Sequence, residues 1–144
     1  NAYGPGQNLP PVHAPVVPLY LKNTLTNASV VVHGDGSQTR DFVYIDDVVA
    51  AYLLLLQQHL ELPRAFTQLG LGSGQAVRIR DFVERVHRLS QSRTELKFGA
   101  LPYREGEIME SAADTAGLRA LGWSPRFTLE EALKTTLARE SNAS

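Results

Sequence analysis

An arginine and an aspartate, Arg40 and Asp41, stand at the start of a stretch that otherwise has the pattern of a buried β-strand. The stretch is HGDGSQTRDFVYIDD, residues 33–47. Charged side chains are seldom fully buried unless they are paired. Arg40 therefore either lies at an exposed strand end beside a neighbouring carboxylate, or has an anionic ligand. A guanidinium suits the second role, because its planar fork binds two phosphate oxygens at once and stays charged at any working pH.

The composition excludes several kinds of site. The 144 residues include no cysteine, so the chain has no disulfide and no cysteine-ligated metal. His13, His59 and His87 do not have the spacing of metal ligands, and we expect them at the surface. Lysine and arginine number 14 against 15 aspartates and glutamates, which argues against a nucleic-acid-binding surface built on net charge. We expect no metal and no nucleic-acid partner.

The leucine run at 53–56 is too short to span a membrane, because polar residues flank it closely on both sides. No signal-peptide pattern precedes it, so we expect a cytoplasmic protein without a membrane partner. The chain opens on NAYGPGQ, without a start methionine. We expect it to be cut from a longer protein.

Alternating strands and helices are predicted to position the arginine. SVVVH and TRDFVYI are predicted to be two strands of a hairpin, joined by a turn at Asp35-Gly36. Asp46 is expected to cap the helix that follows, with Asp47 in its first turn, where negative charge favours the helix dipole. This helix is apolar almost all round, which predicts that it is covered on more than one side. A shorter helix, PLYLKNTL, is predicted to begin at Pro18.

The second half of the chain continues the alternation. AFTQLGLGSG predicts a strand that ends in a glycine turn, and TELKFGAL predicts a later short strand. Apolar residues between 79 and 89 recur at three- and four-residue steps, which is typical of an amphipathic helix. A short helix over 114–121 is predicted to end at Gly122, and Thr128 with Glu131 predicts a capping box at the start of the last helix. The fold class is therefore α/β, with α+β character locally.

Four segments, taken in order, carry a resemblance: NAYGPGQ, HGDGSQTRDFVYIDDVV, LGSG before a helix, and REGE followed by AD and LGWSP. Together they resemble the C-terminal half of the extended short-chain dehydrogenase/reductases, in the branch of NAD-dependent nucleotide-sugar epimerases and dehydratases. The resemblance is strongest to the UDP-glucose and UDP-N-acetylglucosamine 4-epimerases, and it runs from Asn1 to about Leu137. It implies the substrate-binding C-terminal part of a Rossmann-type enzyme, whose N-terminal NAD-binding half is absent from this sequence.

The resemblance implies a substrate-binding role for four residues. Asn1, before Tyr-Gly-Pro, would lie near the sugar and the diphosphate, and His33, before Gly-Asp-Gly, would lie against the nucleobase. Arg40, in the Arg-Asp-Phe triplet, would bind the diphosphate, and Arg104 would bind it from the other side. Two arginines from separate loops can bracket a diphosphate that one arginine would hold only loosely.

Each of these residues also has a structural interpretation. Alternatively, Arg40 forms an ion pair with a neighbouring carboxylate, and Arg104 forms a loop ion pair with a glutamate beside it. His33 read alone is a packed or surface histidine, and Asn1 read alone caps a turn. Trp123 is interpreted as core packing.

Two departures from the family pattern bear on function. The family often has an asparagine two residues before the Gly-Ser-Gly turn, where this chain has Gly70, so any polar contact of that asparagine is missing. The family's glycine-rich dinucleotide turn and its Tyr-x-x-x-Lys pair are also absent. Tyr44 and Tyr52 have no lysine four residues on, and GLGSG lies too far along the chain to be the dinucleotide turn. We therefore expect no catalytic and no cofactor-binding residue in this chain.

We accordingly expect residues 1–140 to form a nucleotide-sugar-binding region and residues 141–144 a frayed tail. The parent would be an NAD-dependent 4-epimerase of a UDP-sugar or another nucleotide-sugar, with NAD bound by the absent N-terminal half, and this chain alone would be inactive. The alternatives are a 4,6-dehydratase or reductase of the same family and, from another class, a non-catalytic nucleotide-sugar-binding or structural module. Without the missing half, the chain would either self-associate through exposed apolar surface or be loosely packed, with the segment before Pro18 mobile.

Overall fold

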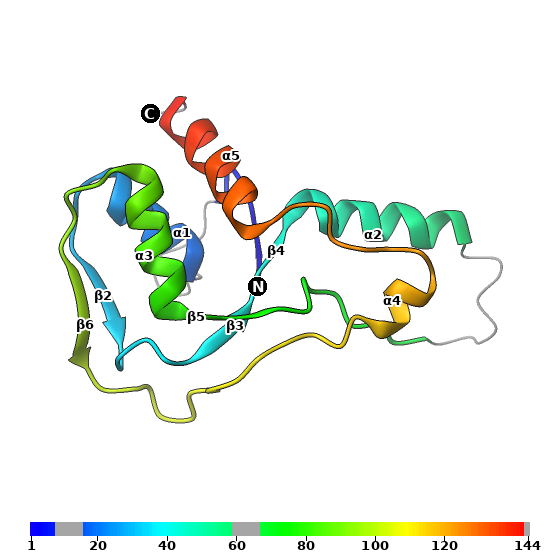
Figure 1. Ribbon diagram of the computed structural model, residues 1–144, viewed down its shortest axis with the longest axis horizontal. Coiled ribbons are helices and arrows are strands. Elements are labelled where there is room, and N and C mark those ends of the chain that lie inside the picture. Colours follow the sequence, from blue (N-terminus) through cyan, green and yellow to red (C-terminus); the bar gives the residue numbers. More distant parts are fainter. Residues whose placement is uncertain (8–15, 59–66, 143–144) are drawn as a thin grey trace.

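The structure, a computed structural model, describes residues 1–7, 16–58 and 67–142. Its elements lie in two groups along an elongated molecule (Figure 1). The larger group contains three helices and two strands: α1 (Val16–Leu25), α3 (Ile79–Ser90), α5 (Leu129–Asn142), β2 (Val30–His33) and β6 (Leu96–Leu101). The smaller group contains two helices: α2 (Ile45–Gln58) and α4 (Ala116–Ala120).

Short strands pair in three separate two-stranded sheets within the described part of the chain. β2 pairs in parallel with β6, and β1 (Ala2–Tyr3) pairs in parallel with β4 (Val43–Tyr44). β3 (Thr39–Asp41) runs antiparallel to β5 (Ala76–Arg78). Helices separate the strands that pair in parallel, so the predicted α/β class is confirmed.

The predicted hairpin between SVVVH and TRDFVYI is wrong, because β2 and β3 pair with different partners. The turn that follows β2 instead packs on the start of α3, whose first N–H groups have no partner inside the helix. Ile79 N–H donates to the Gln38 carbonyl and Arg80 N–H to the Gly36 carbonyl, both at 2.9 Å. Gly36 has φ +83°, and a Cβ there would lie 3.0 Å from the Arg80 nitrogen, so the turn requires glycine.

Two other predicted strands differ from the structure. TRDFVYI is not one strand, because Phe42 separates β3 from β4, and α2 begins at Ile45, one residue before the predicted cap Asp46. The strand predicted for AFTQLGLGSG is wrong in its described part, residues 67–74, which contains no strand. This part winds around the carboxylate of Asp41, which accepts its main-chain N–H groups in place of a neighbouring strand.

The helices predicted from periodicity and caps are confirmed, whereas α1 begins at Val16, two residues before the predicted start at Pro18. α3 buries apolar residues at three- and four-residue steps: Ile79, Phe82, Val83 and Val86. α4 is followed by Gly122, which has φ +91°. The capping box of α5 is formed, with Thr128 N–H donating to the Glu131 carboxylate at 2.9 Å and Glu131 N–H to the Thr128 hydroxyl at 3.3 Å. The helix continues through Asn142, so the first two residues of the predicted tail are helical.

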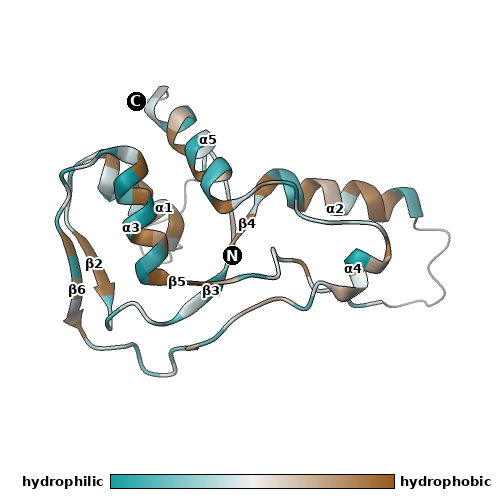
Figure 2. Ribbon diagram, viewed as in Figure 1, coloured by the Kyte–Doolittle hydropathy of each residue, from teal (hydrophilic) through white to brown (hydrophobic). Residues whose placement is uncertain are grey.

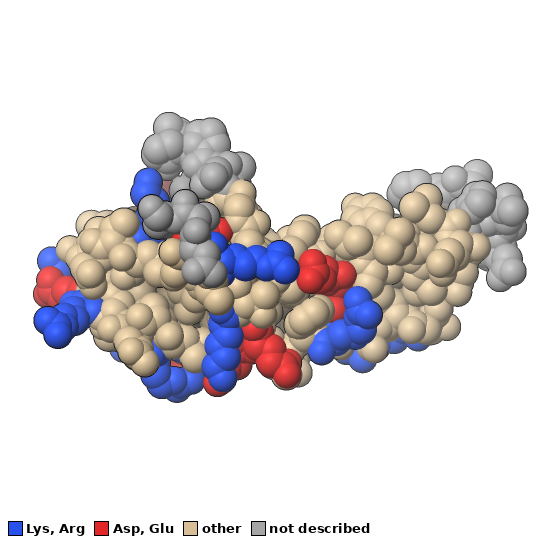
Figure 3. Space-filling model, turned by 90° about the horizontal axis from the view of Figure 1, so that it is seen from above, with Lys and Arg blue, Asp and Glu red and all other residues tan. Residues whose placement is uncertain are grey.

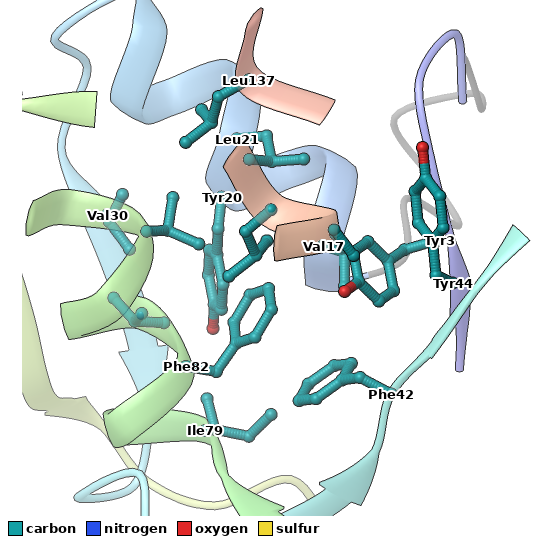
Figure 4. Close-up of a cluster of buried hydrophobic side chains, with 14 of the residues drawn as sticks. Tyr3, Val17, Tyr20, Leu21, Val30, Phe42, Tyr44, Ile79, Phe82 and Leu137 are labelled. Carbon is teal, nitrogen blue, oxygen red and sulfur yellow. The ribbon is translucent and has the colours of Figure 1, made fainter. Parts of the chain in front are cut away.

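The larger core joins α1, α3 and α5 to β1, β2 and β4 and to Phe42, which lies between β3 and β4 (Figure 4). Aromatic rings form its centre. Phe42 stacks on Phe82 with ring centroids 4.3 Å apart, and Tyr3 contacts Phe42 edge-on at 6.4 Å. Tyr44 packs against Phe127, just before α5, at 4.9 Å. The core therefore fixes Phe42, the last residue of the Arg-Asp-Phe triplet, and β4, the strand that follows it.

The helix α2 is held at its first turn. Its buried residues are Asp47 and Ala51. The Asp47 carboxylate accepts the N–H of Arg126 at 2.9 Å and of Phe127 at 3.3 Å, and the Trp123 indole N–H donates to the Asp47 carbonyl at 3.0 Å. Trp123 is buried, as predicted, in a small cluster with Ala51 and α4.

The opposite side of α2 is not covered by the described residues. Four large apolar side chains on it are 47–67% exposed, and we call them the α2 stripe: Val49, Tyr52, Leu53 and Leu56. Figure 2 shows the strongly apolar colour of this helix, and Figure 3 shows few charged side chains over it. The described residues thus cover the helix on one side, whereas its composition predicts cover on more than one.

Candidate functional site

Arg40 lies at the centre of β3 and is held by three hydrogen bonds. Its Nη1 donates to the main-chain carbonyls of Thr39 at 2.7 Å and Ile108 at 2.6 Å. Its Nη2 donates to the carboxylate of Glu107, and the two side chains are 18% and 15% exposed. The structure therefore contains the carboxylate partner that was one alternative for Arg40. Its role toward a ligand remains a prediction.

A long irregular segment, residues 104–113, runs beside β3. Thr39 N–H donates to the Met109 carbonyl at 2.8 Å, and Ala113 N–H donates to the Asp41 carboxylate at 3.0 Å. Together with the Arg40 contacts, these bonds mean that each residue of β3 holds part of the segment. The segment that begins at Arg104 is therefore attached to β3, the strand that contains Arg40.

Arg104 lies in an exposed turn at the start of this segment. The turn is closed by the Glu107 N–H, which donates to the Arg104 carbonyl at 3.1 Å, and Gly106 within it has φ +72°. Burial raises the pKa of Tyr20 to about 12, while the charge of Arg104 lowers this pKa and that of Glu107 raises it. Both charges therefore act on one hydroxyl, and Glu107 also pairs with Arg40. The structure brings the two predicted arginines into one region.

His33 ends β2 and lies against the residues just before this segment. Its Nδ1 is 3.1 Å from the Pro102 carbonyl oxygen. The next residue, Tyr103, packs its ring on Gly34, where a Cβ would collide with the ring. An aromatic side chain thus lies beside the Gly-Asp-Gly turn, but it comes from Tyr103, which the sequence analysis did not identify.

The hydroxyl of Tyr103 fixes the same turn. It lies 2.7 Å from the Ser37 hydroxyl and donates to the Asp35 carboxylate. The hydrogen bond from Tyr103, followed by those from Ser37, lowers the pKa of Asp35 to about 2. Tyr103, a residue far from the turn in sequence, therefore holds the turn in one conformation. The only sequence signal for this contact was an aromatic residue next to Arg104.

Asn1 lies at the exposed start of the chain, beside the end of β3. Its side-chain Nδ2 donates to the Asp41 carbonyl at 3.3 Å, and its own carbonyl accepts the Val43 N–H at 3.2 Å. These contacts are structural. The predicted role of Asn1 toward the sugar and diphosphate remains a prediction.

Asp41 is the residue that sequence reasoning missed most clearly. It is 4% exposed and accepts hydrogen bonds from Ser73 Oγ at 2.6 Å, from the N–H groups of Ser73 and Gly74 at 2.7 and 2.9 Å, and from Ala113 N–H. Burial alone would raise its pKa, but these hydrogen bonds outweigh burial, and the pKa is lowered. Its partners are 32 to 72 residues away, so no local pattern reveals them.

Close packing explains the departure from the family pattern at Gly70. A Cβ at Gly70 would collide with the main-chain oxygen of Asp114, so no side chain fits there. A Cβ at Gly72 would lie 2.5 Å from the Asp41 carboxylate. Both glycines are therefore required by the backbone that surrounds Asp41.

A cavity of about 300 Å³ lies between β4 and the start of α5, and Phe42 and Ser73 are part of its lining. Its polar lining includes Asp47, Arg85 and Glu130. The Asp47 carboxylate already accepts two main-chain N–H groups there. None of the four predicted substrate-binding residues lines this cavity.

No group of three or more potential metal ligands exists among residues 1–7, 16–58 and 67–142. His13 and His59 lie outside the described residues, and His87 is half-buried with its Nε2 3.0 Å from the Thr94 carbonyl oxygen. In the same described ranges, every helix is too short or too polar to cross a membrane.

Comparison with known sequences identifies relatives over nearly the whole chain. Residues 1–67 match the model of the NAD dependent epimerase/dehydratase family. The chain is 33% identical to a CDP-abequose synthase of Salmonella typhimurium, over 96% of this chain and 46% of that protein. It is also 33% identical to a dTDP-L-rhamnose 4-epimerase of Burkholderia thailandensis, over 97% of this chain and 38% of that protein. The chain thus spans less than half the length of these curated relatives.

The fold is shared with solved structures. A UDP-glucose 4-epimerase of Thermotoga maritima, solved with UDP-glucose, superposes with a TM-score of 0.84 at 30% identity. The match covers 99% of this chain and 44% of that one. The arrangement of helices and parallel strands described above is therefore that of the corresponding part of a Rossmann-type epimerase.

Proposed function

We propose that this chain belongs to the NAD-dependent epimerase/dehydratase family and is the nucleotide-sugar-binding part of a nucleotide-sugar 4-epimerase. We assign this role to residues 1–140. Two of the three similar proteins are named 4-epimerases, and the solved one was crystallised with UDP-glucose, so a UDP-sugar is the ligand class we propose.

The convergence of Arg40 and Arg104 is the observation that carries this proposal. The two residues are 64 positions apart in the sequence, yet one residue, Glu107, joins them: its carboxylate pairs with Arg40, and its main-chain N–H donates to the Arg104 carbonyl. A diphosphate needs cationic groups on two sides, and guanidinium groups bind phosphate oxygens in pairs. Two guanidinium groups on adjoining segments fit that requirement.

Further contacts follow from the neighbours of the two arginines. His33 and the ring of Tyr103 lie at the Gly-Asp-Gly turn, where we propose that the nucleobase packs. Asn1 lies beside the end of β3, and its amide is a candidate hydrogen-bond partner for the sugar or the diphosphate. The chain would thus bind and orient the nucleotide part of the ligand.

The glycine-rich run of this chain does not have the free N–H groups of a dinucleotide turn. Dinucleotide folds bind the pyrophosphate with free N–H groups of a glycine-rich turn. The glycine-rich run of this chain donates its Ser73 and Gly74 N–H groups to Asp41 instead. We therefore propose that NAD, which supplies hydride-transfer chemistry when bound, is held by residues outside this sequence.

The relative named CDP-abequose synthase has the same 33% identity as the 4-epimerase of Burkholderia. A dehydratase or reductase of the same family is therefore the second candidate. Incubation of the full-length protein with a UDP-sugar and NAD, followed by product analysis, separates the two candidates. An epimer with unchanged mass supports the 4-epimerase, and a product that has lost water or gained hydrogen supports the alternative.

Calorimetric titration of UDP and UDP-glucose into the full-length protein tests the binding role directly. We expect saturable binding that is lost when Arg40 and Arg104 are both replaced by alanine. Binding without turnover would indicate a non-catalytic module. Unchanged binding in the double variant would contradict the proposed site.

A further inference from the structure

The ion pair between Arg40 and Glu107 differs from the others in its environment. Its two side chains are 18% and 15% exposed. The side chains of the five other ion pairs found in the described residues are 38–71% exposed. A sheltered pair is screened less by water and salt than an exposed one. Glu107 therefore occupies the guanidinium more firmly than a surface carboxylate would.

The hydrogen bonds of Arg40 define where an anion could bind. A guanidinium has five N–H groups. Both Nη1 donors are used by the carbonyls of Thr39 and Ile108, and Glu107 takes a donor of Nη2. An anion bound by two donors must therefore use Nη2 together with Nε. Its oxygens would then lie beside the Glu107 carboxylate, which carries the same charge and uses the same nitrogen.

The turn that carries Glu107 is exposed at Gly106. One main-chain hydrogen bond, of 3.1 Å, closes it from Glu107 to Arg104. Gly106 lies inside the turn, has φ +72°, and has no neighbouring atom within 4 Å of the place where a Cβ would be. The exposed Arg104 is part of the same turn. A ligand that reaches Arg104 as well as Arg40 gains a second cationic contact to offset the loss of the ion pair.

We propose that Glu107 is an internal competitor for Arg40, and that it makes the site select a diphosphate over a single anion. In the free protein, Glu107 occupies the guanidinium. Orthophosphate, which has one phosphate group where a diphosphate has two, competes poorly with this carboxylate, whereas a diphosphate displaces it with the help of Arg104. This inference rests on the proposed function and assigns a specificity-determining residue to its site.

The test uses the full-length protein and two probes without sugar or base, inorganic pyrophosphate and orthophosphate. Glu107→Gln keeps the size of the side chain and removes its charge. We expect this variant to bind orthophosphate about tenfold more tightly, as the release of one charge-assisted contact implies, and to bind pyrophosphate more tightly by a smaller factor. The selectivity for pyrophosphate therefore falls. Glu110→Gln is the matched control, since Glu110 lies in the same segment and is exposed, while the side-chain hydrogen bonds of Arg40 described above go to Thr39, Ile108 and Glu107.

A double-mutant cycle with Arg40→Ala completes the test. The gain in anion affinity from Glu107→Gln should disappear when Arg40 is replaced by alanine. Glu107→Ala should reproduce this gain in affinity if the charge of Glu107 is its cause. Unchanged or weaker anion binding in both Glu107 variants overturns the inference. If UDP still binds and depends on Arg40, that result leaves the proposed function standing. If no variant binds UDP or pyrophosphate, both are overturned together.

Discussion

The carboxylate of Asp41 accepts two hydrogen bonds from Ser73, one from its main-chain N–H at 2.7 Å and one from its hydroxyl at 2.6 Å. The same carboxylate accepts the N–H groups of Gly74 and Ala113. Asp41 thereby joins β3 to the glycine-rich run and to the 104–113 segment. Because the neighbouring Arg40 holds the same segment, Asp41 is a positioning residue for the candidate site.

We predict that Asp41→Asn lowers the free energy of unfolding by roughly 2–3 kcal/mol. An amide has one acceptor oxygen, and its NH₂ group would face N–H donors, so buried donors are left without partners. Urea denaturation measures the change. Asp81→Asn is the control, because Asp81 pairs with Arg78 in a mainly exposed position, and it should change stability much less.

The pKa of Asp41 gives this prediction a pH dependence. Its pKa is lowered in the folded state, so its stabilising contribution is present above the unfolded value of about 3.9 and is lost as the pH falls through the folded value. The stability difference between the parent and Asp41→Asn should therefore be constant near neutral pH and shrink below about pH 4. A difference that persists undiminished to strongly acidic pH would show that the charge of Asp41 is not the cause.

We predict that Arg40→Ala and Arg104→Ala each weaken UDP-sugar binding by the full-length protein and leave NAD binding intact. A hydrogen-bonded contact to a charged group is worth roughly 1.5–3 kcal/mol, which corresponds to about one to two decades in affinity. Lysine at either position should restore only part of the loss, because its point charge lacks the planar fork. Calorimetry with UDP-glucose measures both effects.

Arg93→Ala serves as the control for the two arginine variants. Arg93 is exposed in the loop between α3 and β6, away from β3. We expect its removal to leave affinity unchanged. Parent-like binding by both site variants would refute the diphosphate assignment.

Local patterns predicted the helices of this chain well. The apolar steps of α3, the glycine after α4 and the Thr128–Glu131 capping box all depend on residues within a few positions of each other. In each of these patterns, all the interacting residues belong to one helix or to the residues directly beside it. Their prediction does not require knowledge of the tertiary fold.

Strand pairing and the buried carboxylates could not be predicted in this way. β2 pairs with β6, more than 60 residues further along the chain, so a turn signal after β2 suggested the wrong partner. Asp47 has the position of a helix-dipole residue, yet its carboxylate binds N–H groups 79 and 80 residues away. Arg40 was singled out because a charge at a strand is unusual. Its partner Glu107 is visible only once the 104–113 segment is placed beside β3.

We predict that the purified 144-residue chain neither binds NAD nor converts UDP-sugars. None of its five tyrosines has a lysine four residues later, and its glycine-rich run is committed to Asp41. Titration followed by nicotinamide fluorescence tests cofactor binding, and a product assay with added NAD tests turnover. Epimerisation by the purified chain would contradict both expectations.

We predict that the purified chain self-associates through the α2 stripe, Val49, Tyr52, Leu53 and Leu56. These side chains recur at three- and four-residue steps and form one apolar face, and large exposed apolar patches are uncommon on soluble monomers. Sedimentation velocity should show oligomers. Leu53→Glu should weaken association by at least about tenfold, because it would place an unpaired charge in the contact.

Leu101→Glu is the matched control, since Leu101 is 44% exposed on β6, at the opposite end of the molecule from α2 (Figure 1). The same charge there should leave association unchanged.

Adding the part of the protein that corresponds to the unmatched half of the relatives, as a separate chain, should suppress self-association by covering the stripe. Hydrogen exchange should then show increased protection in α2. A compact monomer with strongly protected amides throughout residues 1–60, in the absence of any added chain, would show that the stripe needs no partner and would overturn this prediction.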